Sequence, residues 1–200
     1  MTNVVEKFRP LFYPRGIVVT GVSQHPGKFG AVAFHNLIAG GYQGELFPIN
    51  REGVASFGRP TYKSVLEVPV GRADLAFICT PNSANEQLLR DCARIGVRAA
   101  FVASAGYGEA ADGREAEDRL VALGRELGIL IAGPNGQGLI STRVSMCAQI
   151  VAPYPPPGPI SVVSQSGNLA SSFMNYGCLT GVGMSKAISC GNSAMLELAD

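Results

Sequence analysis

The sequence has 200 residues, enough for one domain or for one domain and part of another. Hydrophobic residues make up 46% and charged residues only 16%, which excludes disorder as the main state. The formal net charge of +1 excludes the broad basic surface of a nucleic-acid-binding protein. No apolar run reaches membrane-span length, and charges and prolines stand where a secretory signal needs an apolar stretch. We therefore expect a cytoplasmic protein without a membrane partner.

The five cysteines are odd in number and irregularly spaced, and no Cys-x-x-Cys pair occurs. This pattern favours reduced thiols over a disulfide framework or a structural zinc site. We therefore predict no metal site.

Strand and helix patterns alternate as far as residue 132. Short, continuously apolar runs predict strands at 16–20, 46–49, 75–79, 99–103 and 129–132. Helices are expected at 29–39, 82–95 and 112–127, the second with Asn82 as its N-cap. Continuously apolar strands joined by helices predict a parallel sheet covered on both faces, in a Rossmann-like, doubly wound α/β domain.

A proline-rich segment interrupts this alternation at residues 152–159, where five of eight residues are proline. Such a segment predicts a stiff connector. Beyond it, strands are expected at 160–163 and 185–189, with a helix between them and another from Ala194. So short a segment cannot close an α/β sheet of its own. We therefore expect a domain at 1–152, a linker at 153–159 and a second, truncated α/β domain at 160–200, in a chain that is a fragment.

Ligands of doubly wound sheets bind beyond the carboxyl ends of the strands. The first such loop, GVSQHPGKFG, offers small residues, a helix N-terminus and the cation of Lys28, which together suit a phosphate. Its glycines do not have the G-x-G-x-x-G spacing, and a plain surface turn is the alternative. The candidates from this loop are Gly21, Ser23, Gln24, His25, Pro26, Gly27, Lys28, Phe29 and Gly30.

The second strand is followed by Asn50 and Arg51, where NAD-binding proteins place an acidic residue. A basic group here suits a phosphorylated ribose, as in NADP or in the 3′-phospho-adenosine end of coenzyme A (CoA). An ordinary exposed arginine is the alternative, and Glu52 keeps NAD open.

The later strand ends give weaker signals. Cys79 is expected to be a core thiol rather than a nucleophile, because no base stands next to it in the sequence. The binding candidates from these loops are Cys79, Thr80, Pro81, Asn82, Ser104, Ala105, Gly106 and Asn135.

The motif SQSG opens the helix after the proline-rich segment. Ser164, Ser166 and Gly167 combine hydroxyls with the free N–H groups of a helix start, which makes an anion site. Simple N-capping is the alternative. A serine nucleophile is disfavoured because the G-x-S-x-G pattern is not met.

Taken together, these segments resemble a known family in order and spacing. GVSQHPGKFG, FPIN, AFICTPN, VASAGYGE and GPNGQGLIS resemble the CoA-binding domain of the NDP-forming acyl-CoA synthetases. That family includes the α subunit of succinyl-CoA synthetase and ADP-forming acetyl-CoA synthetase. SVVSQSGNLASSFMNYG and ISCGNSAMLELAD resemble the opening of the family's flavodoxin-like ligase domain. The resemblance covers nearly the whole chain.

The resemblance implies a ligase that interconverts an acid, CoA and NTP with acyl-CoA, NDP and phosphate, through an acyl phosphate and a phosphohistidine. It implies that the loops of the first domain hold CoA and that the SQSG helix start stabilises the phosphohistidine. NDP, NTP and magnesium would bind only regions absent here. An ATP-grasp β subunit or domain is therefore the expected partner, and an oligomer the expected assembly.

Two departures from the family matter. Its phosphorylated histidine lies farther along the second domain than this chain reaches, and His25 and His35 stand at non-matching positions. We therefore assign no catalytic residue and expect the chain to be inactive alone. Many members also carry a cysteine directly after GPN, where this chain has Gly136 and then Gln137. An NADP-dependent oxidoreductase and a non-catalytic CoA-binding regulator remain alternatives.

Overall fold

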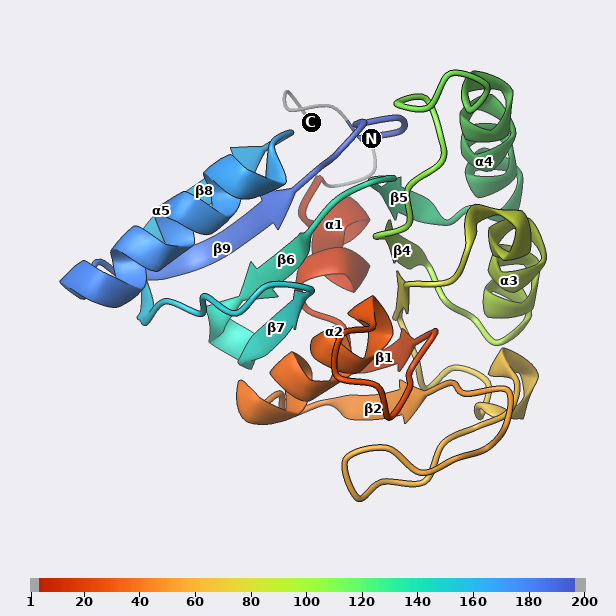
Figure 1. The fold of residues 1–200 in the computed structure, drawn as a ribbon, viewed down its shortest axis with the longest axis horizontal. Helices are drawn as coiled ribbons and strands as arrows, with labels where there is room; N and C mark the ends of the chain where they lie inside the picture. Colours follow the sequence, from red (N-terminus) through yellow and green to blue (C-terminus); the bar gives the residue numbers. More distant parts are fainter. Residues whose placement is uncertain (1–3, 197–200) are drawn as a thin grey trace.

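The first of two sheets is parallel and five-stranded. In the computed structural model, which describes residues 4–196, its order is β2-β1-β3-β4-β5 (Figure 1). The strands are β1 (Gly16–Val19), β2 (Glu45–Pro48), β3 (Leu75–Ile78), β4 (Ala99–Val102) and β5 (Leu130–Ala132). Every residue of β1, β3 and β4 is buried, as their continuous apolar character predicts. The predicted Rossmann-like sheet is confirmed, and the observed strands begin and end within one residue of their predicted bounds.

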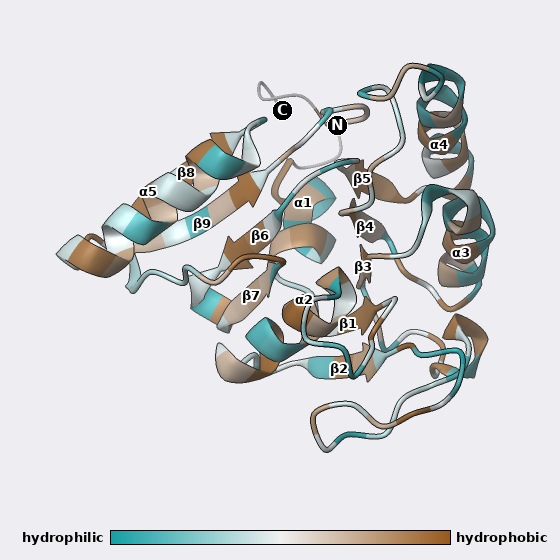
Figure 2. Cartoon of the chain, viewed as in Figure 1, coloured by the Kyte–Doolittle hydropathy of each residue, from teal (hydrophilic) through white to brown (hydrophobic). Residues whose placement is uncertain are grey.

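Helices cover both faces of this sheet. The helix α2 (Phe29–Ala39) packs through Phe34 and Leu37 on one face, together with α1 (Val4–Phe12). On the other face lie α3 (Asn82–Arg94), α4 (Arg114–Leu127) and the short 3-10 helix η1 (Val65–Glu67). Figure 2 shows brown strands in the interior and teal on the outer sides of α3 and α4. The parallel sheet is thus doubly wound, and α1 is an addition that the sequence did not predict.

The second sheet is mixed and four-stranded, in the order β7-β6-β9-β8. Its strands are β6 (Gly138–Ser141), β7 (Met146–Gln149), β8 (Pro157–Ser164) and β9 (Met184–Ser189), with the 3-10 helix η2 (Thr142–Val144) between the first two. Only β8 and β9 are parallel to each other. The helix α5 (Gly167–Thr180) covers one face of this sheet through Met174, as the predicted strand-helix-strand pattern requires.

Pairing in the second sheet differs from the expected division of the chain. The residues of β6 and β7 fall within the expected first domain, 1–152, yet β6 pairs with β9. The expected linker also contributes its last three residues, 157–159, to β8, and Pro155 is buried. Strands from both sides of residues 153–159 therefore form one sheet, and a domain boundary there remains a prediction. The helix expected from Ala194 runs into residues 197–200, outside the described residues.

Among residues 4–196, no helix is both long enough and apolar enough to cross a membrane.

Candidate functional site

A pocket of about 640 Å³ lies at the carboxyl ends of β1, β2 and β3. This is the edge at which doubly wound sheets bind ligands, where the strand order reverses. Its walls come from the loops after the three strands, the start of η1 and the first turns of α3. The predicted residues that line it are Gly21, Ser23, Asn50, Arg51, Thr80 and Pro81.

Two glycines let the backbone approach closely where the turn after β1 meets α2. Gly21 has φ +68, a left-handed conformation that side chains with a Cβ rarely adopt. A Cβ on Gly30 would collide with the carbonyl oxygen of Gly21, so α2 begins directly against the turn after β1. A bare turn followed by a helix start is the arrangement that admits a phosphate. The residue before α2, Lys28, supplies no side-chain cap to it.

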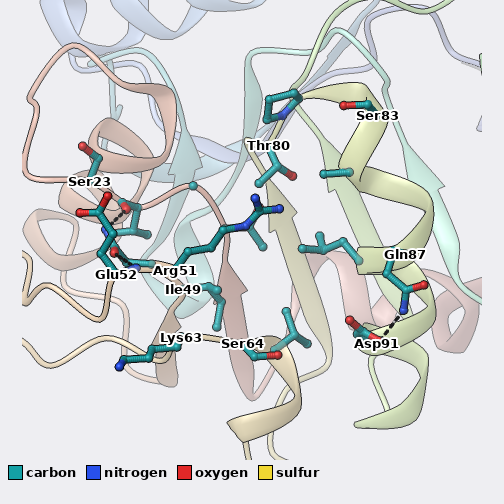
Figure 3. Close-up of a pocket in the computed structure, with 18 residues that line it drawn as sticks. Ser23, Ile49, Arg51, Glu52, Lys63, Ser64, Thr80, Ser83, Gln87 and Asp91 are labelled. Carbon is teal, nitrogen blue, oxygen red and sulfur yellow. Dashed lines mark hydrogen bonds between the residues drawn. The ribbon is translucent and has the colours of Figure 1, made fainter.

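Asn50 and Arg51 shape the second wall. The Asn50 amide donates to the Val22 carbonyl at 2.8 Å and its Oδ1 accepts from Glu52 N at 2.9 Å, which ties the first two loops together. Figure 3 shows the Arg51 side chain extending across the pocket toward Thr80, whereas Glu52 lies at the side of Ser23. Within residues 4–196, Arg51 enters no ion pair. The pocket therefore holds a cation without a carboxylate partner.

Among the lining residues that sequence reasoning missed are Lys63, Ser64, Gln87 and Asp91. Lys63 and Ser64 reach the pocket because Tyr62 pairs with the backbone of Pro48 and Asn50. That pairing brings a long loop back to the edge of β2, and no local sequence pattern predicts this path. Gln87 and Asp91 lie one helical turn apart on α3, so the helical period could have revealed them.

A second hollow, of about 420 Å³, lies between the starts of α2 and α5 and the turn after β5. It is lined by another group of predicted residues, which are Phe29, Ala105, Asn135, Ser166 and Gly167. The candidate residues are thus divided between two hollows. The loop of residues 21–30 runs from one to the other, since Gly21 lines the first and Phe29 the second.

The start of α5 is capped by its own serines. Ser166 Oγ accepts from Leu169 N at 3.2 Å, and Ser164 Oγ accepts from Ser166 N at 3.1 Å. N-capping, the alternative left open by the sequence, is therefore present. An anion-stabilising role for Ser164, Ser166 and Gly167 remains a prediction.

Gln137 links the second hollow to α5 and was not among the candidates. Its Nε2 donates to Asn168 Oδ1 at 3.2 Å, and its Oε1 accepts from Ser171 Oγ at 2.5 Å. A Cβ on Gly167 would overlap the Gln137 side chain. The glycine of SQSG thus makes room for the residue that joins the turn after β5 to the helix.

Several predicted residues line neither hollow. In the first loop, Gln24 Nε2 donates to the Ala55 carbonyl at 3.1 Å, and His25 Nδ1 accepts from Gly27 N at 3.1 Å. Pro26 lies beside His35 and Phe57 in a hollow of about 280 Å³. These contacts hold the loop itself in shape.

The loops after β3 and β4 are joined by side-chain hydrogen bonds. Asn82 is not the N-cap of α3, since Pro81 occupies that position, and its amide donates instead to the Gly106 carbonyl at 2.7 Å. Ser104 Oγ accepts from the buried amide of Asn85 at 2.9 Å. Burial raises the pKa of the Cys79 thiol, so it stays protonated, consistent with a core thiol.

A carboxylate connects the loop after β4 to the turn after β9. Glu109 accepts hydrogen bonds from the amides of Gly106 and Tyr107, and from Asn192 Nδ2 at 2.6 Å. Burial opposes its ionisation, but these hydrogen bonds outweigh burial and lower the pKa of Glu109. The same Asn192 amide donates to Glu117 Oε2 at 2.7 Å. The loop that carries Ser104, Ala105 and Gly106 is thereby fixed against the second sheet.

Comparison with protein families shows what kind of chain this is. Residues 15–141 match the model of a CoA binding domain. The chain belongs to the CoA-binding domain family. Residues 157–200 match the succinyl-CoA ligase like flavodoxin domain, so the order of the two matches follows the resemblance noted in the sequence.

Longer relatives carry the same two parts. The chain is 37% identical over 195 residues to the α subunit of ADP-forming acetate–CoA ligase I of Pyrococcus furiosus, covering 95% of this chain and 42% of the relative. It is 33% identical over 188 residues to the ADP-forming acetate–CoA ligase of Methanocaldococcus jannaschii, covering 94% and 26%.

A solved structure has the same fold. The dinucleotide-forming acetyl-coenzyme A synthetase 1 of Ca. Korarchaeum cryptofilum, in complex with phosphate and ADP, superposes with a TM-score of 0.90 at 31% identity. The superposition covers 96% of this chain and 41% of that one. This chain thus spans less than half the length of these similar proteins.

Proposed function

We propose that this chain binds CoA in the pocket at the ends of β1, β2 and β3. The observation that carries the proposal is Arg51, which forms no ion pair within residues 4–196 and extends into this pocket at the switch point of the sheet. A guanidinium is suited to a phosphorylated ribose because its N–H groups can bind a phosphate in pairs. The CoA-binding family match of residues 15–141 supports CoA as the ligand, and we assign its 3′-phosphate to Arg51.

The residues present fit a CoA molecule. Bare backbone at Gly21 and the uncapped start of α2 suit its pyrophosphate, and Lys28 adds positive charge at that helix start. The loop of residues 21–30 continues from this pocket to the second hollow beside Asn135 and Ala105. CoA is long enough to follow that loop, so we assign its thiol end to the second hollow.

We further propose that the complete enzyme is an NDP-forming acyl-CoA synthetase. CoA supplies the thiol that becomes the acyl thioester. In this chain, Ser164, Ser166 and Gly167 would stabilise negative charge at the start of α5, next to the hollow assigned to the thiol. The similarity of the chain to ADP-forming acetate–CoA ligases supports this reaction class.

The remaining parts of such an enzyme would come from elsewhere. We propose that a phosphorylated histidine and an ATP-grasp subunit or domain complete the site, in an oligomer located in the cytoplasm. The chain alone would then bind CoA without turnover. The absence of a family-matching histidine among its residues supports this division, since His25 and His35 are its only histidines.

Calorimetric titration of the purified chain with CoA, NADP and NAD tests the proposal. Saturable binding of CoA, with weaker or no binding of both dinucleotides, is the expected result. NADP binding without a response to CoA would contradict it and favour an oxidoreductase, because Arg51 suits the 2′-phosphate of NADP equally well.

A further inference from the structure

The two hollows that hold the candidate residues differ in charge. Arg51, Glu52, Lys63 and Asp91 line the pocket at the ends of β1, β2 and β3. Within residues 4–196, no side chain of Asp, Glu, Lys, Arg or His lines the second hollow, between the starts of α2 and α5. A ligand group that enters the second hollow therefore finds no charged side chain to pair with.

Large apolar side chains line the second hollow from two elements. Phe29 is the first residue of α2, and its side chain is 51% exposed. Ile150 follows β7, and its backbone N–H donates to the Gln137 carbonyl at 2.8 Å. The helix and this backbone pairing hold both residues in place. An exposed aromatic ring at a hollow offers a ligand a large apolar contact.

The polar side chains of this hollow are already engaged with one another. The Gln137 amide donates to Asn168 Oδ1 at 3.2 Å and accepts from Ser171 Oγ at 2.5 Å. Asn135 Nδ2 donates to Asn192 Oδ1 at 3.3 Å. A polar ligand group would have to displace these hydrogen bonds. An apolar group needs no such displacement, so it gains more from this hollow.

The hollow is also larger than an acetyl group requires. Its volume is about 420 Å³. One water molecule occupies roughly 30 Å³ of the liquid, and a methyl group is of similar size. Gly136 contributes no side chain to the lining, since a Cβ there would collide with the Phe101 ring and the Ser189 carbonyl oxygen. Room therefore remains beside the thiol end of CoA for a group much larger than methyl.

We infer that the acyl group bound in the second hollow is uncharged, apolar and larger than acetyl, and that Phe29 and Ile150 select it. The inference rests on the proposed function, in which the thiol end of CoA lies in this hollow. Burial of an apolar acyl group against these two side chains is favourable. A second carboxylate, as in a succinyl group, would lose its hydration without gaining a cation.

This substrate class differs from acetate, the acid named for the Pyrococcus furiosus α subunit. Branched-chain and aromatic monocarboxylic acids belong to it, and dicarboxylic acids do not.

Calorimetric titration of the full chain with CoA, acetyl-CoA, phenylacetyl-CoA and succinyl-CoA tests the inference. Phenylacetyl-CoA should bind at least about tenfold more tightly than acetyl-CoA, as is typical of added apolar groups in a hydrophobic pocket. Succinyl-CoA should bind no more tightly than acetyl-CoA. Because all the esters share the CoA part, the ratio of their affinities within one protein reports on the acyl group alone.

Variants of the two selecting residues should change these ratios. Phe29→Ala and Ile150→Ala should each reduce the preference for phenylacetyl-CoA over acetyl-CoA at least about threefold, because each removes apolar contact. Phe29→Lys supplies a cation and should raise the affinity for succinyl-CoA relative to acetyl-CoA. Phe173→Ala is the matched control, since Phe173 is 49% exposed and lines neither hollow. Thermal unfolding verifies that each variant is folded at the temperature of titration.

The outcomes separate this inference from the proposed CoA site. If CoA binds but the acetyl and phenylacetyl esters have equal affinities, the inference is overturned and the CoA site stands. A preference of the wild type for succinyl-CoA, or an unchanged preference in Phe29→Ala, would also overturn it. If neither CoA nor any of its esters binds, the proposed function and the inference fail together.

Discussion

Gly136 lies so close to the ring of Phe101 that a Cβ added to it would stand 2.6 Å from Cζ of that ring. Phe101 is fully buried and stacks on Phe77, with ring centroids 5.2 Å apart. The same added Cβ would collide with the carbonyl oxygen of Ser189, so the strand after α5 closes the site from the other side. Phe101 and Ser189 thus occupy the room that a side chain after Pro134-Asn135 would need.

This packing predicts that Gly136→Ala destabilises the protein by about 1–3 kcal/mol, because overpacking forces a buried ring or a strand to shift. Gly136→Cys introduces the residue that many members of the resembled family carry at this position, and it should cost at least as much. Urea unfolding followed by circular dichroism measures both. Gly27→Ala is the matched control, since its nearest neighbour would be the exposed imidazole of His25 at 3.1 Å, and it should stay within about 0.5 kcal/mol of the wild type. Equal stability of the Gly136 and Gly27 variants would show that the site can relax.

Asn85 joins the loops that form two walls of the site. Its Oδ1 accepts from Thr80 Oγ1 at 2.8 Å, and its Nδ2 donates to Ser104 Oγ and to Tyr107 OH. Asn85→Ala leaves the buried Tyr107 and the partly buried Thr80 and Ser104 without this partner, and should cost about 1–3 kcal/mol of unfolding free energy.

The Asn85 variant should also bind CoA more weakly at temperatures where it remains folded, because the loops after β3 and β4 lose their link. Gln43→Ala removes an exposed amide with a single hydrogen bond to its own turn and should change neither quantity. Unchanged stability of Asn85→Ala would mean that water replaces the amide without cost.

The pair Arg15 and Asp74 predicts a pH dependence. Hydrogen bonds from the Arg15 guanidinium lower the pKa of Asp74, despite the opposing effect of burial. A lowered carboxyl pKa contributes stability that is fully present above the unfolded value, near 4, and is lost as pH falls through the folded value. Asp74→Asn should therefore cost about 1–3 kcal/mol at pH 7, and the difference from wild type should shrink below about pH 4.

Glu45→Gln is the control for this pair, because Glu45 and Arg72 are both exposed and their ion pair should contribute less than about 1 kcal/mol. Denaturant unfolding at a series of pH values measures both variants. A pH-independent difference between Asp74→Asn and wild type would assign the loss to packing rather than to charge.

The first sheet was predictable because its strands are short, fully apolar and punctuated by glycine and proline, as in Leu75–Ile78 before Thr80-Pro81. β6 and β7 were not predicted, since their pairing with β9 depends on residues far along the chain. α1 was missed because it is short and contains Pro10. Local pattern thus reveals the elements of a parallel sheet but not the partners of a mixed one.

Within the candidate site, topology alone selected the loops that line the pocket. It could not divide their residues between two hollows, because that depends on how the second sheet packs against the turn at Asn135. Lys63 lines the pocket because a long loop pairs with the end of β2, and local sequence patterns do not predict the path of that loop. Gln137 was passed over because its function rests on a contact with Gly167, thirty positions later in the chain.

A thermodynamic cycle between Arg51 and the 3′-phosphate of CoA tests the central claim most directly. Calorimetry gives the affinities of the wild type and of Arg51→Ala for CoA and for 3′-dephospho-CoA, with Arg59→Ala as an exposed control on the same loop. We predict that Arg51→Ala weakens CoA binding by about 1.5–3 kcal/mol, the contribution of a hydrogen bond to a charged group, and leaves 3′-dephospho-CoA binding unchanged. Equal losses for the two ligands, or no binding of CoA by the wild type, would contradict the assignment of this pocket to CoA.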